Sequence, residues 1–134
     1  MKIVTTIDFS TTTERILKTT AIYAKALNAE VFLVHTEPEK FDKDAEERDH
    51  TPEAVMLKKD AMALQRVGVT VTPLFLKGPI CETIMKEAQR LKADLIIIGA
   101  HGHGGATCKA SIGDISKCVL LRVGIPVLII PAER

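Results

Sequence analysis

The chain has 134 residues, of which 46% are hydrophobic and 26% charged, and its formal net charge is +1. This length and composition predict one globular domain over residues 1–134. A net charge so close to zero gives no support for binding to nucleic acid or to a membrane surface. The apolar runs are a few residues long, far short of the roughly 20 that cross a bilayer, so no membrane span is expected.

The N-terminus and the cysteines both favour a cytoplasmic location. The first apolar run is short and meets Asp8 almost at once, unlike the apolar region of a signal peptide. The three cysteines, Cys81, Cys108 and Cys118, are widely spaced and form no C-x-x-C motif. A reducing cytoplasm is their simplest setting, with Cys81 and Cys118 as packing residues inside helices.

A strand and a helix are predicted before residue 30. Lys2–Ile7 is rich in β-branched residues and ends at Asp8, which predicts a strand with a carboxylate at its C-terminal end. Thr11 and Glu14 have the spacing of a capping box, in which each side chain binds a backbone N–H at the start of a helix. Apolar residues at helical spacing continue up to Asn28, which is expected to end this helix.

The next part of the chain predicts a second strand, a connection and a second helix. Residues 30–36 contain a continuous apolar run that is typical of a buried strand. The charged and irregular segment 37–50 is expected to be a solvated, mobile connection with no buried role. Thr51 and Pro52 provide an N-cap followed by proline, so a helix is expected to begin there and to end at Gly68.

Three more strands and two more helices are predicted in the second half. Residues 69–76 alternate in hydrophobicity and suggest a strand near an edge of the sheet. Gly78 and the proline after it precede a helix, residues 95–98 form a short apolar strand, and residues 115–123 resume helical spacing. The last strand, 126–131, has proline at both ends, which suits an edge strand.

Strands and helices therefore alternate along the whole chain. This pattern predicts an α/β fold, namely a doubly wound, five-stranded parallel sheet with helices on both faces. In such sheets ligands bind outside the carboxyl ends of the strands, where the strand order reverses. Asp8, Thr36 and Gly99 all lie at predicted carboxyl ends. We therefore expect a binding site at this edge.

A glycine-rich stretch follows the fourth predicted strand. Four glycines, Gly99, Gly102, Gly104 and Gly105, fall within seven residues, and a helix is predicted to follow them. A strand, a glycine loop and a helix N-terminus together let backbone N–H groups face an anion. A glycine loop alone is a weak signal, because many such loops are only tight turns.

On these residues the chain resembles the universal stress protein family over its whole length. The similarity lies in Val4–Ser10, Val34–Thr36, Gly99–Gly102, Gly113 and Val127–Ile130. The resemblance implies the strand order 3-2-1-4-5 and a homodimer formed through the last strand, Pro126 to Pro131. It also implies a role in stress survival, and a cleft that binds ATP in some members of the family and not in others.

The ATP-binding members carry the motif G-x2-G-x9-G-(S/T), and this chain fits only its first half. Gly99 and Gly102 have the expected spacing. Ten residues then separate Gly102 from Gly113, one more than in the motif, and Asp114 stands where ATP binders have Ser or Thr. An ionised carboxylate accepts hydrogen bonds but donates none, so Asp114 would repel a phosphate unless Mg²⁺ lay between them. Asp114 could instead be a structural acid at the start of the last helix.

The resemblance also assigns residues to a nucleotide site. Asp8 would accept from the ribose or the adenine, and the backbone of Thr36 would meet the adenine. The glycine loop would line the ribose and phosphates, and the start of the last helix would close the phosphate end. The residues expected at this site are Thr6, Ile7, Asp8, Thr36, Ile98, Gly99, His101, Gly102, His103, Gly113, Asp114, Ile115 and Ser116.

Two functions of different classes follow. One is a stress-response regulatory module that binds ATP, with Mg²⁺, in this cleft. The other is an interaction protein that binds no ATP and acts through dimerisation and partner binding. Catalysis is not expected beyond slow ATP hydrolysis, because no nucleophile elbow, triad or general base is evident. His101, His103 and Cys108 lack a fourth ligand, so no metal site is expected.

Overall fold

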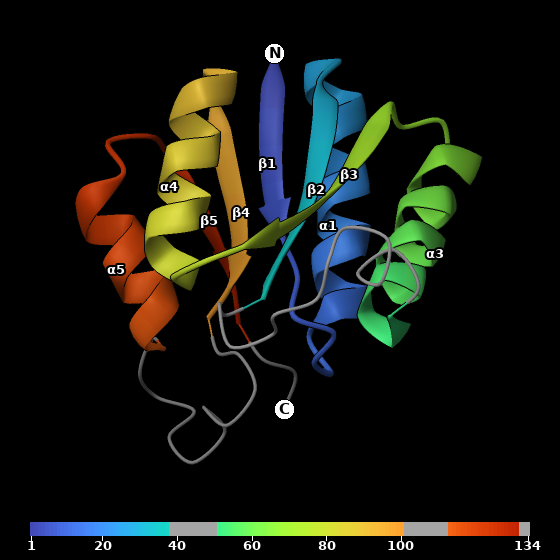
Figure 1. The fold of residues 1–134 in the computed structure, drawn as a ribbon. Helices are drawn as coiled ribbons and strands as arrows, with labels where there is room; N and C mark the ends of the chain where they lie inside the picture. The colour runs from blue at the N-terminus through green and yellow to red at the C-terminus, as the bar shows by residue number, and fades with distance from the viewer. Residues whose placement is uncertain (38–50, 101–112, 132–134) are drawn as a thin grey trace.

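A five-stranded parallel sheet forms the centre of the protein, as a computed structural model shows for residues 1–37, 51–100 and 113–131 (Figure 1). Its strands are β1 (Lys2–Thr6), β2 (Glu30–Glu37), β3 (Val71–Lys77), β4 (Leu95–Gly99) and β5 (Val127–Ile130). They lie in the order β3-β2-β1-β4-β5, and every neighbouring pair is parallel. The predicted fold class, strand order and edge position of the last strand are confirmed.

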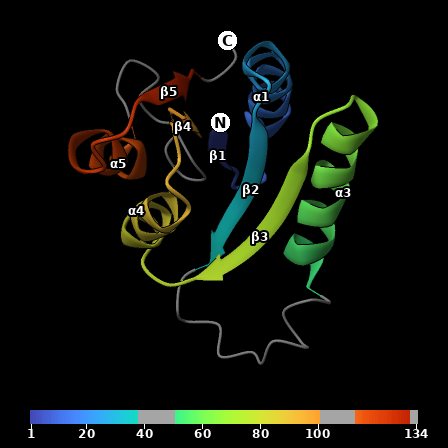
Figure 2. The ribbon, with the colours of Figure 1, turned by 90° about the horizontal axis from the view of Figure 1, so that it is seen from above.

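Helices cover both faces of the sheet. They are α1 (Thr13–Leu27), α3 (Pro52–Arg66), α4 (Ile80–Leu91) and α5 (Asp114–Arg122). In Figure 2 the sheet separates α1 and α3 on one side from α4 and α5 on the other. Of the helices in the described ranges, none is long and apolar enough to cross a membrane.

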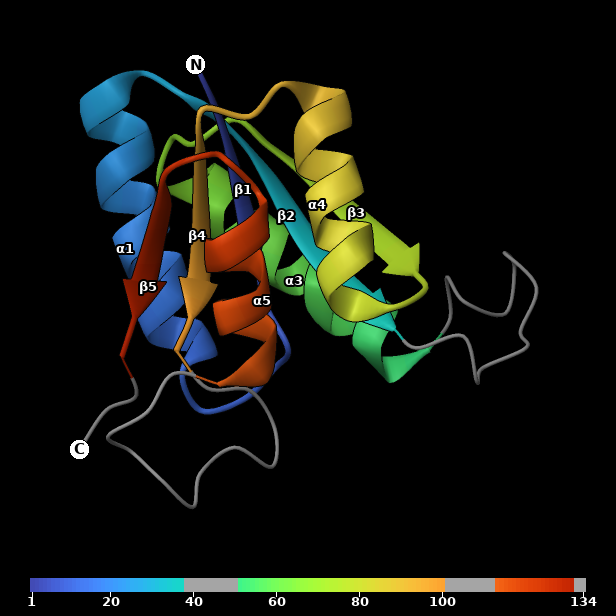
Figure 3. The same cartoon turned by 90° about the vertical axis from the view of Figure 1, so that its left-hand side faces the viewer.

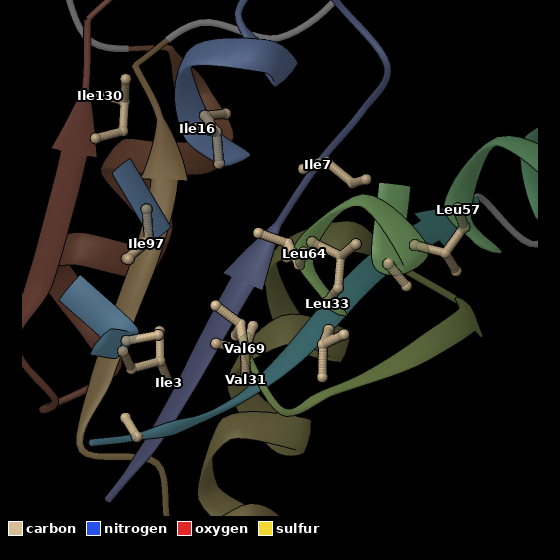
Figure 4. Packing of buried hydrophobic residues seen from close by; sticks show 14 residues of the cluster. Ile3, Ile7, Ile16, Val31, Leu33, Leu57, Leu64, Val69, Ile97 and Ile130 are labelled. Atoms are coloured by element: carbon tan, nitrogen blue, oxygen red, sulfur yellow. The ribbon is translucent and has the colours of Figure 1, made fainter. Parts of the chain in front are cut away.

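Alternate residues of the strands build two separate hydrophobic clusters. Ile3 of β1 and Ile97 of β4 belong to the cluster under α1 and α3, which Figure 4 shows. Their sequence neighbours, Val4 of β1 and Ile96 of β4, belong to the cluster under α4 and α5. All four side chains are fully buried. Burial of each such side chain contributes about 1.5–3 kcal/mol, so both layers are firmly held to the sheet.

The helix ends confirm most of the predicted signals. Asn28 ends α1 in the left-handed conformation, with φ of 51°. The hydroxyl of Thr51 caps α3 by accepting from the backbone N–H of Ala54 at 3.2 Å. Pro52 then occupies the first turn of α3, as predicted.

The predicted capping box of α1 is wrong. The helix begins at Thr13, and its N-cap, Thr12, makes no side-chain capping bond. Ser10 closes the turn instead, because its carbonyl accepts from the N–H of Thr13 at 3.1 Å. Phe9, with a positive φ of 62°, lies directly before this turn. Glu14 forms an exposed ion pair with Lys18 rather than a capping bond.

The interpretation of Cys81 and Cys118 as packing residues is also wrong. They form a disulfide that joins α4 to α5, with their Cα atoms 6.3 Å apart. The two helices pack side by side on one face of the sheet, which brings residues 37 positions apart together (Figure 3). The cytoplasmic location remains a prediction, without the support that unpaired thiols would have given it.

The expectation for segment 37–50 can be compared with the structure at one residue only. Glu37 is the last residue of β2 and pairs with the buried His35, so the predicted lack of a buried role is wrong there. Residues 38–50 lie outside the described part of the chain.

Candidate functional site

A cavity of about 750 Å³ lies at the carboxyl edge of the sheet. Its walls come from the ends of β1, β2 and β4 and from the N-terminal parts of α1, α3, α4 and α5. Of the predicted site residues, those that line it are Thr6, Ile7, Asp8, Thr36, Ile98, Gly99, Gly113, Asp114, Ile115 and Ser116. His101, Gly102 and His103 lie outside the described residues. The remaining lining residues are Phe9, Ile16, Val34, His35, Glu37, Glu53, Met56, Ile80 and Ile84.

One end of the cavity is formed by the junction of β4 with α5. The buried hydroxyl of Ser116 donates to the carbonyl oxygen of Gly99. The N–H of Gly113 donates to the carbonyl of Ala100 at 2.6 Å. These bonds hold the first turn of α5, whose backbone N–H groups have no carbonyl within the helix to donate to, beside the end of β4. A helix N-terminus in this position favours an anionic group of a ligand.

Ser116 therefore also has a structural role at this junction. Its hydroxyl proton is used by Gly99, so only its oxygen lone pairs remain for a ligand. Asp114, by contrast, is exposed at the start of α5. It adds a negative charge at the same place where the helix N-terminus favours one.

The end of β1 is fixed by a turn around Asp8. A carboxylate oxygen of Asp8 accepts from the backbone N–H of Ser10 at 3.0 Å. Between them Phe9 adopts the left-handed conformation, which is uncommon for a residue with a side chain. This turn points the chain away from the sheet and leaves Asp8 on the cavity wall.

His35 is a buried residue of the cavity that the sequence analysis did not select. Its Nδ1 lies 2.9 Å from the carbonyl oxygen of Ile7, and its Nε2 lies 2.6 Å from Oε1 of Glu37. Its ring also packs against Phe9 and Phe75, with centroids 4.5 and 5.5 Å away. A carbonyl oxygen only accepts, so Nδ1 is the donor in the contact with Ile7. His35 thereby connects the ends of β1 and β2.

Thr36 has a hydroxyl without a partner. The side-chain oxygen is buried and makes no hydrogen bond within the described part of the chain. The residue as a whole is 8% exposed and lines the cavity. Leaving such a group unsatisfied costs about 1–3 kcal/mol, which is the cost that a ligand atom in the cavity could remove.

The described wall of the cavity is acidic and apolar. It carries four carboxylates, Asp8, Glu37, Glu53 and Asp114, and its described residues include no lysine or arginine. Among the described residues no group of three His, Cys, Asp or Glu is arranged to hold a metal ion.

Solved structures with this fold include proteins crystallised with nucleotides. Hypothetical protein MJ0577 aligns with a TM-score of 0.84 and 26% identity, over 99% of this chain and 96% of that one. A universal stress protein from Archaeoglobus fulgidus in complex with dAMP aligns with a TM-score of 0.76 and 23% identity, over 97% of both chains. A universal stress protein in complex with cAMP aligns with a TM-score of 0.80 and 19% identity, over 99% and 98% of the two chains.

Comparison with curated proteins found no match. The profile of the universal stress protein family matches residues 1–131, which is nearly the whole chain. The protein therefore belongs to the universal stress protein family.

Proposed function

We propose that this protein is a stress-response regulatory module that binds an adenine nucleotide in the cavity at the carboxyl edge of the sheet. The observation that carries the proposal is the convergence of three strand ends and the N-terminus of α5 around about 750 Å³. Ligand cavities of about 300–1,000 Å³ are typical of small-molecule sites. Two structural relatives hold dAMP and cAMP, which supports the same class of ligand here.

The chemistry of the wall supports a nucleoside in the inner part of the cavity. Thr36 offers a hydroxyl that has no partner among the described residues, and the carboxylate of Asp8 accepts hydrogen bonds at the end of β1. Isoleucine side chains from α1, α4 and β4 provide apolar area for a base; they are Ile16, Ile80, Ile84 and Ile98. Ribose hydroxyls and an exocyclic amine would find acceptors here, and a ring nitrogen would find the hydroxyl of Thr36.

The charge of the wall favours a nucleotide with few phosphate charges. A carboxylate and a phosphate oxygen 4 Å apart repel by about 4 kcal/mol at an effective dielectric constant of 20. Asp114 stands at the phosphate end, and the N-terminus of α5 compensates only part of a charge. We therefore expect AMP to bind without a metal ion and ATP to require Mg²⁺ between its phosphates and Asp114.

Calorimetric titration tests this function. The protein is titrated with adenosine, AMP, ADP and ATP, each with Mg²⁺ and with EDTA. We expect micromolar binding of AMP in both conditions, and binding of ATP with Mg²⁺ only. Absence of binding for all four ligands contradicts the proposal.

A second function, an interaction protein that binds no nucleotide, is favoured by one specific observation. Asp114 replaces the hydroxyl residue of the ATP-binding motif, and the spacing before Gly113 is one residue too long. If the titrations fail, this function is the better one. Its partner would then be sought by cross-linking of the full chain.

We further propose that the protein is a homodimer formed through β5. This strand lies at the edge of the sheet, and three of its four residues, Val127, Leu128 and Ile129, are only half-buried. A second copy of β5 would cover them. Sedimentation analysis tests the assembly, and a monomer at micromolar concentration contradicts it.

A further inference from the structure

The disulfide between Cys81 and Cys118 joins the two helices that form one wall of the cavity. Cys81 lies in the first turn of α4, next to the cavity residue Ile80. Cys118 lies one helical turn after Asp114, on α5. Because residues four apart share one side of a helix, the bond acts on the segment of α5 that lines the cavity.

Helix α5 has few other attachments. It has nine residues, and only Ser116 and Val119 are buried. Leu120 and Leu121 are 43% and 73% exposed. A helix this short is not stable by itself in water, so its position depends on its tertiary contacts. The disulfide is the covalent one among them, and the hydrogen bond from Ser116 to Gly99 is another.

The opposite wall of the cavity is held differently. β1 is paired with β2 along the whole length of β1, and His35 connects the ends of the two strands. A change in the disulfide would therefore move the phosphate end of the cavity and leave the nucleoside end in place. The free energy of local opening differs between the parts of a protein, and it is lowest for short elements with little buried surface.

The two sulfur atoms have unequal surroundings that suit thiol–disulfide exchange. Cys118 is partly exposed, and Nη1 of Arg122 lies 3.6 Å from its sulfur, where it attracts an anionic thiolate. Cys81 is 8% exposed and sits at the N-terminus of α4, which stabilises a thiolate. An incoming thiolate thus reaches Cys118 more easily, and Cys81 is the better leaving group.

We propose that Cys81 and Cys118 form a thiol–disulfide exchange site that controls the position of α5 at the cavity. A low-molecular-weight thiolate attacks the sulfur of Cys118, the Cys81–Cys118 bond breaks, and its electron pair leaves on Cys81. A second thiol attacks the mixed disulfide and releases the thiolate of Cys118 and a small disulfide. The protein gains two electrons and, on protonation of both thiolates, two protons; the two small thiols are oxidised.

Hydrogen exchange tests the effect on α5 without any ligand. The protein carries Cys108→Ser, so that the third cysteine takes no part, and is compared after treatment with oxidised or reduced glutathione. Alkylation and mass spectrometry give the fraction of Cys81 and Cys118 that is bonded. We expect backbone amides of residues 114–122 to exchange several-fold faster in the reduced protein, while those of α1 and α3 are unchanged.

A matched variant distinguishes the effect of losing the disulfide from direct effects of glutathione. Cys118→Ser, in the same background, cannot form the bond and is expected to exchange fast in both buffers. The proposal is overturned if the bond fails to form in oxidised glutathione, if it resists a large excess of reduced glutathione, or if α5 exchanges equally in both states. Because the first comparison uses one protein in two states, it holds even if Cys118→Ser folds poorly.

Titration with AMP tests the effect on the cavity, and this arm rests on the proposed nucleotide function. We expect about tenfold weaker binding by the reduced protein, within the usual range of coupling between two sites. Equal affinity in both states overturns the coupling to the ligand. Absence of AMP binding in both states contradicts the proposed function. In that case the hydrogen exchange of α5 still tests the effect of the disulfide on the helix.

Discussion

Nε2 of His35 and Oε1 of Glu37 lie 2.6 Å apart at the end of β2, beside the cavity. The side chain of His35 is 8% exposed and that of Glu37 is 20% exposed, so solvent screens this pair less than an ion pair on the surface. The other ring nitrogen binds the carbonyl of Ile7, just before the turn that carries Asp8. The shape of this end of the cavity therefore depends on one histidine.

Replacement of His35 by alanine is expected to destabilise the protein. It leaves the carbonyl of Ile7 and the carboxylate of Glu37 without their partner, and a buried group left unsatisfied costs about 1–3 kcal/mol. Urea denaturation measures the free energy of unfolding. Glu37→Gln is the matched control, because a glutamine amide can donate to a neutral ring that still donates to Ile7. Equal losses in the two variants would contradict this account of His35.

Replacement of Thr36 by valine is expected to separate stability from binding. Valine has nearly the same shape and removes the unpartnered hydroxyl, so the unfolding free energy should rise by about 1 kcal/mol. If that hydroxyl donates to the nucleotide, the affinity for AMP should fall at the same time. Calorimetry and urea denaturation measure the two quantities on the same sample.

Thr13 offers a matched control for Thr36. Its hydroxyl is also buried without a partner within the described residues, but Thr13 does not line the cavity. Thr13→Val should therefore raise stability by a similar amount and leave the affinity for AMP unchanged. A fall in affinity for both variants, or for neither, would argue against contact between Thr36 and the ligand.

The fold could be predicted because most of its strands contain a short apolar run. The run from Leu95 to Ile98, for example, is fully apolar because both of its faces are covered by helices. The location of the cavity followed from the same pattern, since the carboxyl ends of parallel strands meet at one edge. Asp8 and Gly99 indeed come together there.

Details that depend on side-chain contacts between elements could not be predicted. Glu37 was assigned to the charged segment that follows β2, although residues two apart on a strand share a face and His35 lies two positions before it. Extending the strand by one residue would have revealed the pair. The bond from Cys81 to Cys118 depends on the packing of α4 against α5, for which their spacing in sequence carries no signal.

Asp60 is expected to make stability depend on pH. Burial on α3 raises the pKa of its carboxyl group, and the nearby Lys59 lowers it by less. A pKa that is higher in the folded than in the unfolded state means that stability is present at acidic pH and is lost as the pH rises through the folded pKa. Asp60→Asn should therefore be more stable than the native protein at pH 7, and this difference should shrink toward pH 3. Urea denaturation at several pH values measures it; a difference that does not change with pH would contradict the assignment.

Asp114→Ser should weaken the dependence of ATP binding on metal ions. The substitution removes a charge that repels phosphate and restores the hydroxyl of the ATP-binding motif. Because Asp114 is exposed and screened by solvent, we expect about tenfold tighter binding of ATP in EDTA, equal to about 1.4 kcal/mol. With Mg²⁺ the gain should disappear, since the variant also loses a ligand for the cation.

Glu82→Ser is the matched control: it removes an acid from the first turn of α4 outside the cavity and should leave ATP binding unchanged. Unchanged affinity of Asp114→Ser in EDTA would show that Asp114 does not face the phosphates.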